Sequence, residues 1–292
     1  MPISFIDKVE ELILSNLHSS PTVANEVLKI INDESSSVND LVRILEHDPP
    51  ITATILKIAN SAYYSPTTPI DSLSRSIVAL GFMTIRDIAT SASVIPYFYN
   101  ANGSAGIDLP GLWTHSMGTA KAAQLIAESI HFGNQGIVFI TGLLHDIGKI
   151  IIWVYFPEYY FKINELTTHD KVRSILAERK VLNADHCMVG KLLCDQWSLP
   201  PTISTAISHH HDPSEVDKEN QKLARIIELA DFMCRQAGIG NPGDAVIHKP
   251  SIATLALLGL KKDDFKVRYK DIFEKLVANK SEIESIMANI GT

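Results

Sequence analysis

The chain has 292 residues, 46% of them hydrophobic, and a formal charge of −7 from 26 basic and 33 acidic side chains. This composition excludes a disordered or collagen-like chain and suits about two domains of roughly 150 residues. The acidic balance argues against non-specific binding to nucleic acid or anionic membranes, which requires an excess of Lys and Arg.

The first hundred residues predict a series of short helices. Helix-start signals lie at Pro21, Ser37, Asp48 and Ser72, and apolar residues at helical spacing follow each of them. Gly81 is suited to end the last of these helices. Because no useful stretch alternates between apolar and polar residues with a period of two, we expect an all-α protein.

A change in composition divides the chain. Residues 100–111, NANGSAGIDLPG, are rich in Gly, Asn and Pro and predict a linker. We therefore expect a small N-terminal helical domain over residues 1–105, packed on a larger helical domain over residues 106–292. In the larger domain, helical spacing predicts helices over His115–Ile130, Val138–Ile151, His169–Lys180, Ala184–Gln196, Pro201–His210 and Leu223–Ala237, and one or two more over Asp263–Ile290. Aromatic residues in Val154–Phe161 favour a short strand, although Pro157 interrupts it.

Cysteine usage and apolar patterning indicate the compartment. The three cysteines are odd in number and lack a Cys-x-x-Cys spacing, which is typical of structural thiols in a reducing compartment. The N-terminus, MPISFIDKVEELIL, lacks the features of a secretory signal, and the dense apolar stretch Ile150–Phe156 is far shorter than the ~18 residues of a membrane span. We therefore expect a cytoplasmic protein with no membrane contact.

The negative charge is concentrated in the N-terminal part. Residues 1–110 hold 6 basic and 12 acidic residues, a net charge of −6, whereas residues 111–292 hold 20 and 21, a net charge of −1. This asymmetry favours a protein partner for the N-terminal domain and argues against nucleic acid. The small-residue segment Ala59–Tyr64 is a candidate partner surface, or alternatively a packing surface between helices.

Histidine and aspartate residues recur along the second half of the chain. They are His115, the adjacent pair His145-Asp146, His186, the run His209–His211, and Asp231. Imidazoles and carboxylates are the ligands that Mn, Fe, Ni and Zn prefer. One His-Asp pair cannot complete a metal site by itself, so the other ligands must come from several helices that converge in a bundle core.

These residues resemble the ligand set of the HD superfamily of metal-dependent phosphohydrolases, which has the order His, His-Asp, Asp. The matching positions here are His115, His145, Asp146 and Asp231. The further residues His186 and His210-His211 resemble the binuclear members, which include the HD-GYP cyclic-dinucleotide phosphodiesterases, and leave His209 as a spare histidine. The chain departs from the HD-GYP pattern in lacking the GYP residues.

Two segments of the first half specify the resemblance further. DPPITATILKIANSAYYS and SLSRSIVALGFMTIRDIA closely resemble the N-terminal part of HDOD domains, and WSLPPTISTAISHHHDP also fits their pattern. The resemblance covers roughly residues 10–240. Many HDOD proteins have lost the HD ligands and are thought to act as regulatory interaction modules, whereas this chain keeps a competent ligand at every matched position.

The resemblance implies a centre of two divalent ions, Fe, Mn, Ni or Zn, bridged by Asp146. One ion would take His115, His145 and Asp231, and the other His186, His210 and His211; a single ion on the four core ligands is the alternative. Such a centre would hydrolyse phosphomonoesters or phosphodiesters.

Lys149 lies one turn beyond Asp146, on the same helix face, and could contact a phosphate there or be a solvated lysine at a helix end. The rival hypothesis is a bacterial signalling module without catalysis. It would bind metal or a phosphate-containing ligand and contact a protein partner through its N-terminal domain.

Overall fold

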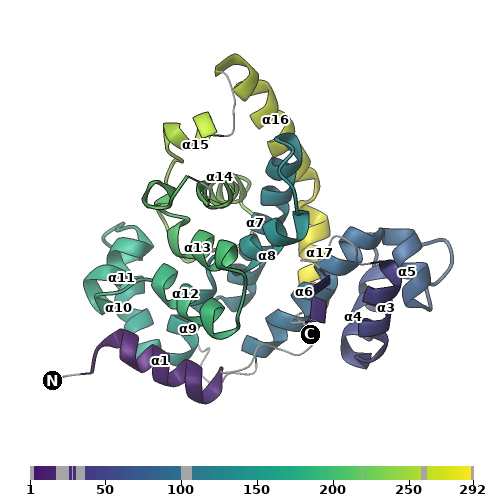
Figure 1. The fold of residues 1–292 in the computed structure, drawn as a ribbon, viewed down its shortest axis with the longest axis horizontal. Coiled ribbons are helices and arrows are strands. Elements are labelled where there is room, and N and C mark those ends of the chain that lie inside the picture. Colours follow the sequence, from purple (N-terminus) through teal and green to yellow (C-terminus); the bar gives the residue numbers. More distant parts are fainter. Residues whose placement is uncertain are drawn as a thin grey trace. The chain divides into compact units, whose positions relative to one another are not determined.

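The computed structural model describes residues 3–17, 26–27, 29–30, 37–99, 107–218, 220–257 and 262–290. These residues form helices and no strand, which confirms the predicted all-α fold class. The chain divides into two compact units (Figure 1). Unit 1 comprises residues 1–19 and 101–277, and unit 2 comprises residues 20–100 and 278–292.

Unit 2 is a small group of helices, in which three of the predicted helix starts are confirmed. Ser37 forms a capping box with Asp40, and the side chains of Asp48 and Ser72 accept backbone N–H groups at the starts of the next helices. The helix expected after Pro21 lies largely outside the described residues. The helices of unit 2 are α3 (Val38–Glu46), α4 (Pro49–Ala59), α5 (Leu73–Leu80), α6 (Phe82–Tyr99) and α17 (Lys280–Ile290).

The C-terminal helix α17 packs on α4 and α6 within unit 2. The Tyr64 hydroxyl donates to Glu282 Oε1 at 2.5 Å, and the hydroxyls of Ser61 and Ser285 lie 3.3 Å apart. The segment Ala59–Tyr64 therefore contributes to packing between helices, which is the second of its two sequence interpretations. The C-terminal residues, which the sequence assigned to the larger domain, complete the smaller unit.

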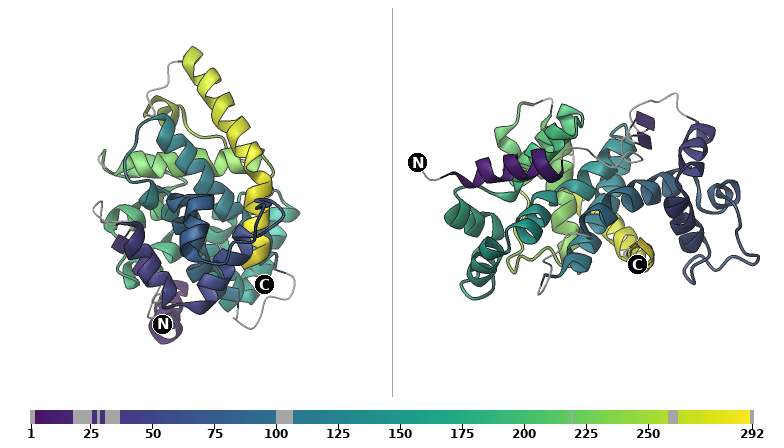
Figure 2. Two further views of the ribbon diagram at one scale, coloured as in Figure 1. Left: turned by 90° about the vertical axis from the view of Figure 1, so that its right-hand side faces the viewer. Right: turned by 90° about the horizontal axis from the view of Figure 1, so that it is seen from below.

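Unit 1 is a larger helical bundle. Its core helices α7, α8, α9, α12, α13 and α14 pack against one another, and Figure 2 shows further views of this arrangement. Its helices are α1 (Phe5–Asn16), α7 (Leu109–Ser129), α8 (Gln135–Leu144), α9 (Ile147–Tyr155), α10 (Pro157–Thr168), α11 (Ser174–Leu182), α12 (His186–Gln196), α13 (Pro201–His209), α14 (Gln221–Gln236), α15 (Ile252–Leu257) and α16 (Lys262–Ala278), with a short 3₁₀ turn, η1 (Pro213–Glu215).

Helix α1 belongs to unit 1 although it begins the chain. The Phe5 ring contacts the rings of Phe156 and Tyr159 edge to face, and Trp197 Nε1 donates to the Leu17 carbonyl at 3.0 Å. The partners of α1 in these contacts are aromatic side chains that lie more than a hundred residues further along the chain. Linker composition alone therefore could not place this helix in the unit that it stabilises.

Three local expectations need correction. The predicted helix Val138–Ile151 is two helices, α8 and α9, which break at His145 and Asp146. Pro110 and Gly111 lie in the first turn of α7 and do not extend the linker, because Asp108 caps the helix and proline is tolerated in a first turn. The suggested strand at Val154–Phe161 is the junction of α9 and α10, since Pro157 sits where a helix tolerates it, at the start.

Helices α8 and α9 form the apolar centre of unit 1. Together, over Gln135–Tyr155, they are long and apolar enough to cross a membrane, but 94% of this apolar stretch is buried inside the fold. This span is longer than the stretch Ile150–Phe156 because His145 and Asp146 interrupt the apolar run only briefly. Helix α8 packs on α7, α13 and α14, and α9 packs on α10 and α12.

Gly148 is required where α9 meets α12. A Cβ atom at this position would lie 2.0 Å from the His186 carbonyl oxygen and 2.9 Å from the Gly190 backbone nitrogen. Because these neighbours are backbone atoms, they cannot rotate away from an added methyl group. The close approach brings α9 and α12 together.

We predict that Tyr64→Phe lowers the free energy of unfolding by about 1–2 kcal/mol, because it removes the hydrogen bond to Glu282 that joins α17 to unit 2. Urea unfolding followed by circular dichroism measures this loss. Tyr63→Phe is the matched control, since Tyr63 is an exposed neighbour. Equal losses in the two variants would contradict the role assigned to the Tyr64 hydroxyl.

We predict that Gly148→Ala destabilises the protein by about 3 kcal/mol, because the methyl group would overlap the backbone of α12. The control is Gly133→Ala, where nothing lies within 4 Å of the added Cβ and the backbone is outside the left-handed region. Thermal unfolding of both variants checks the difference, and a Gly148→Ala protein as stable as the control would refute the tight packing.

Candidate metal centre

The break between α8 and α9 positions the adjacent His145 and Asp146. Both residues lie between the two helices, and both are buried. His145 Nδ1 donates to the Gly142 carbonyl at 2.8 Å, which fixes the ring against the end of α8. Consequently His145 Nε2 faces the Asp146 carboxylate, 3.4 Å from Oδ2.

His210, at the end of α13, is held in the same way. Its Nδ1 donates to the Ile207 carbonyl at 2.8 Å, and its Nε2 lies 3.8 Å from Asp146 Oδ1. A carbonyl can only accept, so the ring proton must be on Nδ1, and Nε2 keeps a free lone pair. Burial, together with the neighbouring His145 and His186, lowers the pKa of His210 to about 3, which keeps the ring neutral and able to bind a cation.

Glu178 orients His186, and sequence reasoning missed this residue. One of its carboxylate oxygens accepts both His186 Nδ1, at 2.6 Å, and the His186 backbone N–H, at 2.8 Å. Its second oxygen accepts the Ser174 hydroxyl at 2.8 Å, so the buried carboxylate is fully engaged. Glu178 lies on α11, in an ordinary charged helical sequence, and no local pattern distinguishes it.

His186 and His211 meet at their outer nitrogens, with 3.1 Å between the two Nε2 atoms. Burial opposes protonation of His186, but Cys187 and Glu178 outweigh it and raise the pKa of His186 well above its ordinary value. Burial and the neighbouring His210 lower the pKa of His211. Without metal, a proton on His186 Nε2 therefore joins the two rings, at the place where both nitrogens could bind one cation.

His115, on α7, pairs with Asp231 on α14. His115 Nε2 lies 3.0 Å from Asp231 Oδ1, and Arg235 Nη1 lies 3.8 Å from the other carboxylate oxygen. Burial alone would lower the pKa of His115, but Cys234 and the Asp231 carboxylate outweigh it and raise that pKa to about 10. The structure thus brings these two predicted ligands into direct contact.

Asp146 lies at the centre of these groups. Its Oδ1 is 3.3 Å from His186 Nε2, and its Oδ2 is 2.8 Å from Lys149 Nζ. Burial opposes ionisation of Asp146, but Lys149, His145 and the other imidazoles outweigh it and hold the pKa of the carboxyl well below its usual range. Lys149 is itself buried, so its interpretation as a solvated helix end is wrong.

The donor set fits divalent cations. His145 Nε2, Asp146 Oδ1 and His210 Nε2 are buried and have no hydrogen-bond partner among the described residues. Such atoms are costly to bury unless a ligand satisfies them. Two groups have ligand atoms within 4.8 Å of one another: His115, His145 and Asp146 in the first, and His186, Cys187, His210 and His211 in the second.

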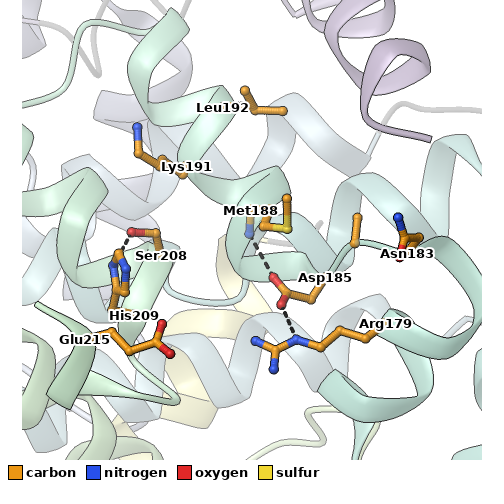
Figure 3. Close-up of a pocket in the computed structure, with 10 residues that line it drawn as sticks. Arg179, Asn183, Asp185, Met188, Lys191, Leu192, Ser208, His209 and Glu215 are labelled. Carbon is orange, nitrogen blue, oxygen red and sulfur yellow. Dashed lines mark hydrogen bonds and ion pairs between the residues drawn. The ribbon is translucent and has the colours of Figure 1, made fainter. Parts of the chain in front are cut away.

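Cys187 was not in the predicted ligand set, whereas His209 is the histidine that the prediction left as spare. Cys187, one of three free and buried cysteines, belongs to the second group, with its Sγ 3.7 Å from His210 Nδ1. That nitrogen already donates to a carbonyl, so the thiol approaches the outer side of the ring. His209 faces elsewhere: its Nδ1 contacts the Ser208 hydroxyl at 2.7 Å, and the residue lines a surface pocket (Figure 3).

Comparison with solved structures shows the same fold in two bacterial proteins. An HDOD domain protein of Geobacter sulfurreducens is 25% identical, with 98% of this chain and 99% of that chain covered and a TM-score of 0.75. A candidate phosphohydrolase of Shewanella amazonensis SB2B is 23% identical, with 98% and 97% covered and a TM-score of 0.72, which shows likeness of fold.

Two sequence comparisons complete the assignment. An uncharacterised protein of Treponema pallidum (strain Nichols) is 20% identical over 225 residues; the match covers 76% of this chain but only 43% of that curated relative. The HDOD domain model matches residues 17–213, well over half of the sequence. The chain therefore belongs to the HDOD domain family.

Proposed function

We propose that this HDOD protein is a divalent-metal-dependent phosphohydrolase acting on a phosphodiester or nucleotide. The observation that carries the proposal is the convergence of the unsatisfied Nε2 atoms of His145 and His210 on the ionised Asp146 carboxylate. The residues that would hold two ions are His115, His145, Asp146 and Asp231 for one, and Asp146, His186, His210 and His211 for the other. The ligand types suit Fe, Mn, Ni or Zn.

The remaining chemistry falls to residues of the chain. Two divalent ions, when bound, would supply a hydroxide at neutral pH and neutralise charge on a phosphoryl group. Glu178 holds the His186 ring in a fixed orientation. Lys149 Nζ is held by Asp146 at 2.8 Å and by the Pro242 carbonyl at 3.3 Å, and we assign it to donate a hydrogen bond to a substrate phosphate oxygen.

The second candidate is a signalling module that binds metal without turnover. The buried Lys149–Asp146 ion pair favours it, because the pair balances the central charge when no cation is present. Unit 1 could then fold in both states, as a sensor requires. In either case we propose a cytoplasmic role in bacterial signal transduction, with a protein partner on the acidic N-terminal part and no contact with nucleic acid or membrane.

We predict that Asp146→Asn abolishes phosphohydrolase activity and lowers the bound metal by at least one ion per chain, because the Asp146 carboxylate faces His145 in one group and His186 in the other. Purified protein loaded with Mn²⁺ or Fe²⁺ is assayed against cyclic dinucleotides, nucleotides and generic phosphodiesters. Its metal content is measured by atomic emission, and Asp170→Asn, at an exposed site, serves as the control.

The outcomes separate the two candidates. Turnover in wild-type protein that disappears in Asp146→Asn supports the hydrolase. Stoichiometric metal without turnover of any substrate contradicts the hydrolase and leaves the signalling module. Absence of bound metal in folded wild-type protein contradicts both, and circular dichroism of Asp146→Asn shows whether its loss is due to unfolding.

We predict that Glu178→Gln weakens Mn²⁺ binding about 10-fold or more, because a neutral amide oxygen holds the two His186 N–H groups more weakly than the carboxylate does. Isothermal titration calorimetry measures the affinity. Glu165→Gln, at an exposed position on α10, is the matched control. Unchanged affinity in a folded Glu178→Gln variant would mean that His186 does not bind the metal.

A further inference from the structure

A pocket separate from the metal-facing side chains lies beside the start of α12. It has a volume of about 620 Å³, and its lining includes Arg179, Asp185, Met188, Leu192, His209 and Glu215. Figure 3 shows Ser208 and His209 across the pocket from Arg179 and Asp185. None of these residues belongs to the predicted ligand set.

Arg179 supplies a fixed cationic donor in this pocket. Its Nε donates to Asp185 Oδ2 at 2.7 Å, while Asp185 Oδ1 accepts the Met188 backbone N–H at 3.0 Å. The Asp185 carboxylate is thus engaged on both oxygens and is 4% exposed, whereas the Arg179 side chain is 57% exposed. The two terminal nitrogens of Arg179 extend away from Asp185 in Figure 3, so the guanidinium presents a fork suited to a phosphate.

The rest of the lining combines apolar surface with hydrogen-bonding groups. Met188 is 46% exposed and forms an apolar wall with Leu192. His209 Nδ1 lies 3.1 Å from the Thr205 carbonyl, which leaves Nε2 available to a ligand. Glu215 is an exposed acceptor suited to hydroxyl groups. A pocket of this volume, with a few polar groups on an apolar wall, is typical of small-molecule sites.

We propose that this pocket binds a small phosphomonoester that carries an aromatic ring, of the size of a nucleoside monophosphate. The phosphate contacts Arg179, the ring lies against Met188 and Leu192, and hydroxyl groups contact Glu215. The lining carboxylates offset the lining cations, so recognition depends on the fork geometry of Arg179 more than on net charge.

Two residues that line the pocket are adjacent in sequence to residues of the candidate metal centre. Arg179 follows Glu178, the carboxylate that holds His186, and Asp185 caps the helix that His186 begins. A ligand that binds Arg179 therefore acts on the Arg179–Asp185 pair and, through it, on the position of His186. By linkage, the phosphomonoester and the metal must change each other's affinity by the same factor. This coupling rests on the proposed metal centre, whereas ligand binding itself does not.

The test is calorimetry with AMP on the full chain without metal, in parallel with adenosine and inorganic phosphate. AMP is expected to bind more tightly than either fragment, both to wild type and to Asp146→Asn. Arg179→Gln should weaken AMP binding at least 10-fold, and Lys180→Gln, an exposed neighbour on α11, should leave it unchanged. Glu215→Gln should strengthen binding of inorganic phosphate, because it removes a negative charge near the guanidinium.

Three results would overturn the inference. If AMP does not bind wild-type protein, or binds no better than adenosine, the pocket does not recognise a phosphomonoester. If AMP binding survives in Arg179→Gln but is lost in Asp146→Asn, the ligand occupies the metal centre instead. Equal Mn²⁺ affinity with and without saturating AMP, in a protein that binds both, would refute the coupling alone.

Discussion

The buried negative charge of Asp146 constrains the core of unit 1. The Asp146 carboxylate lies in an apolar core, where an isolated ion would be strongly destabilising. Lys149 at 2.8 Å and the surrounding imidazoles keep it ionised. Lys149 is one turn away on α9, whereas His186 and His210 come from α12 and the end of α13. The helices that carry these residues must therefore converge on Asp146. The break between α8 and α9 meets this requirement locally, because it allows the consecutive side chains of His145 and Asp146 to point into the same part of the core.

The convergence also determines how each ring presents its nitrogens. His145 and His210 each donate an Nδ1–H hydrogen bond to a carbonyl near the end of a helix, and His186 donates its Nδ1–H hydrogen bond to Glu178. Every one of these bonds turns an Nε2 atom inward. The orientation is therefore set by backbone ends and one carboxylate, and it exists before any cation binds. Such preorganisation lowers the cost of binding, since the ligands need little rearrangement.

Local patterns in the sequence predicted the helices and the His and Asp residues that gather in unit 1, but not the residues whose roles depend on distant contacts. Capping residues such as Ser37 and Asp48 start helices through bonds three residues away, so they can be recognised locally. The His and Asp residues stood out by type and order. Glu178 did not, because its importance comes from His186, eight residues away on another helix. Helix α1 and helix α17 were assigned to the wrong units for the same reason: their partners, Trp197 and Tyr64, lie far along the chain.

The path of the chain between the two units has a consequence for biogenesis. Because unit 2 is formed from residues 20–100 and 278–292, its last helix is synthesised after nearly all of unit 1. During translation, α4 and α6 are synthesised early, and the surface on which α17 packs stays exposed until α17 is made. The ribosome thus completes the larger, histidine-rich unit before the smaller one can close. A chain truncated near its C-terminus would keep the His and Asp cluster and lose the integrity of the other unit.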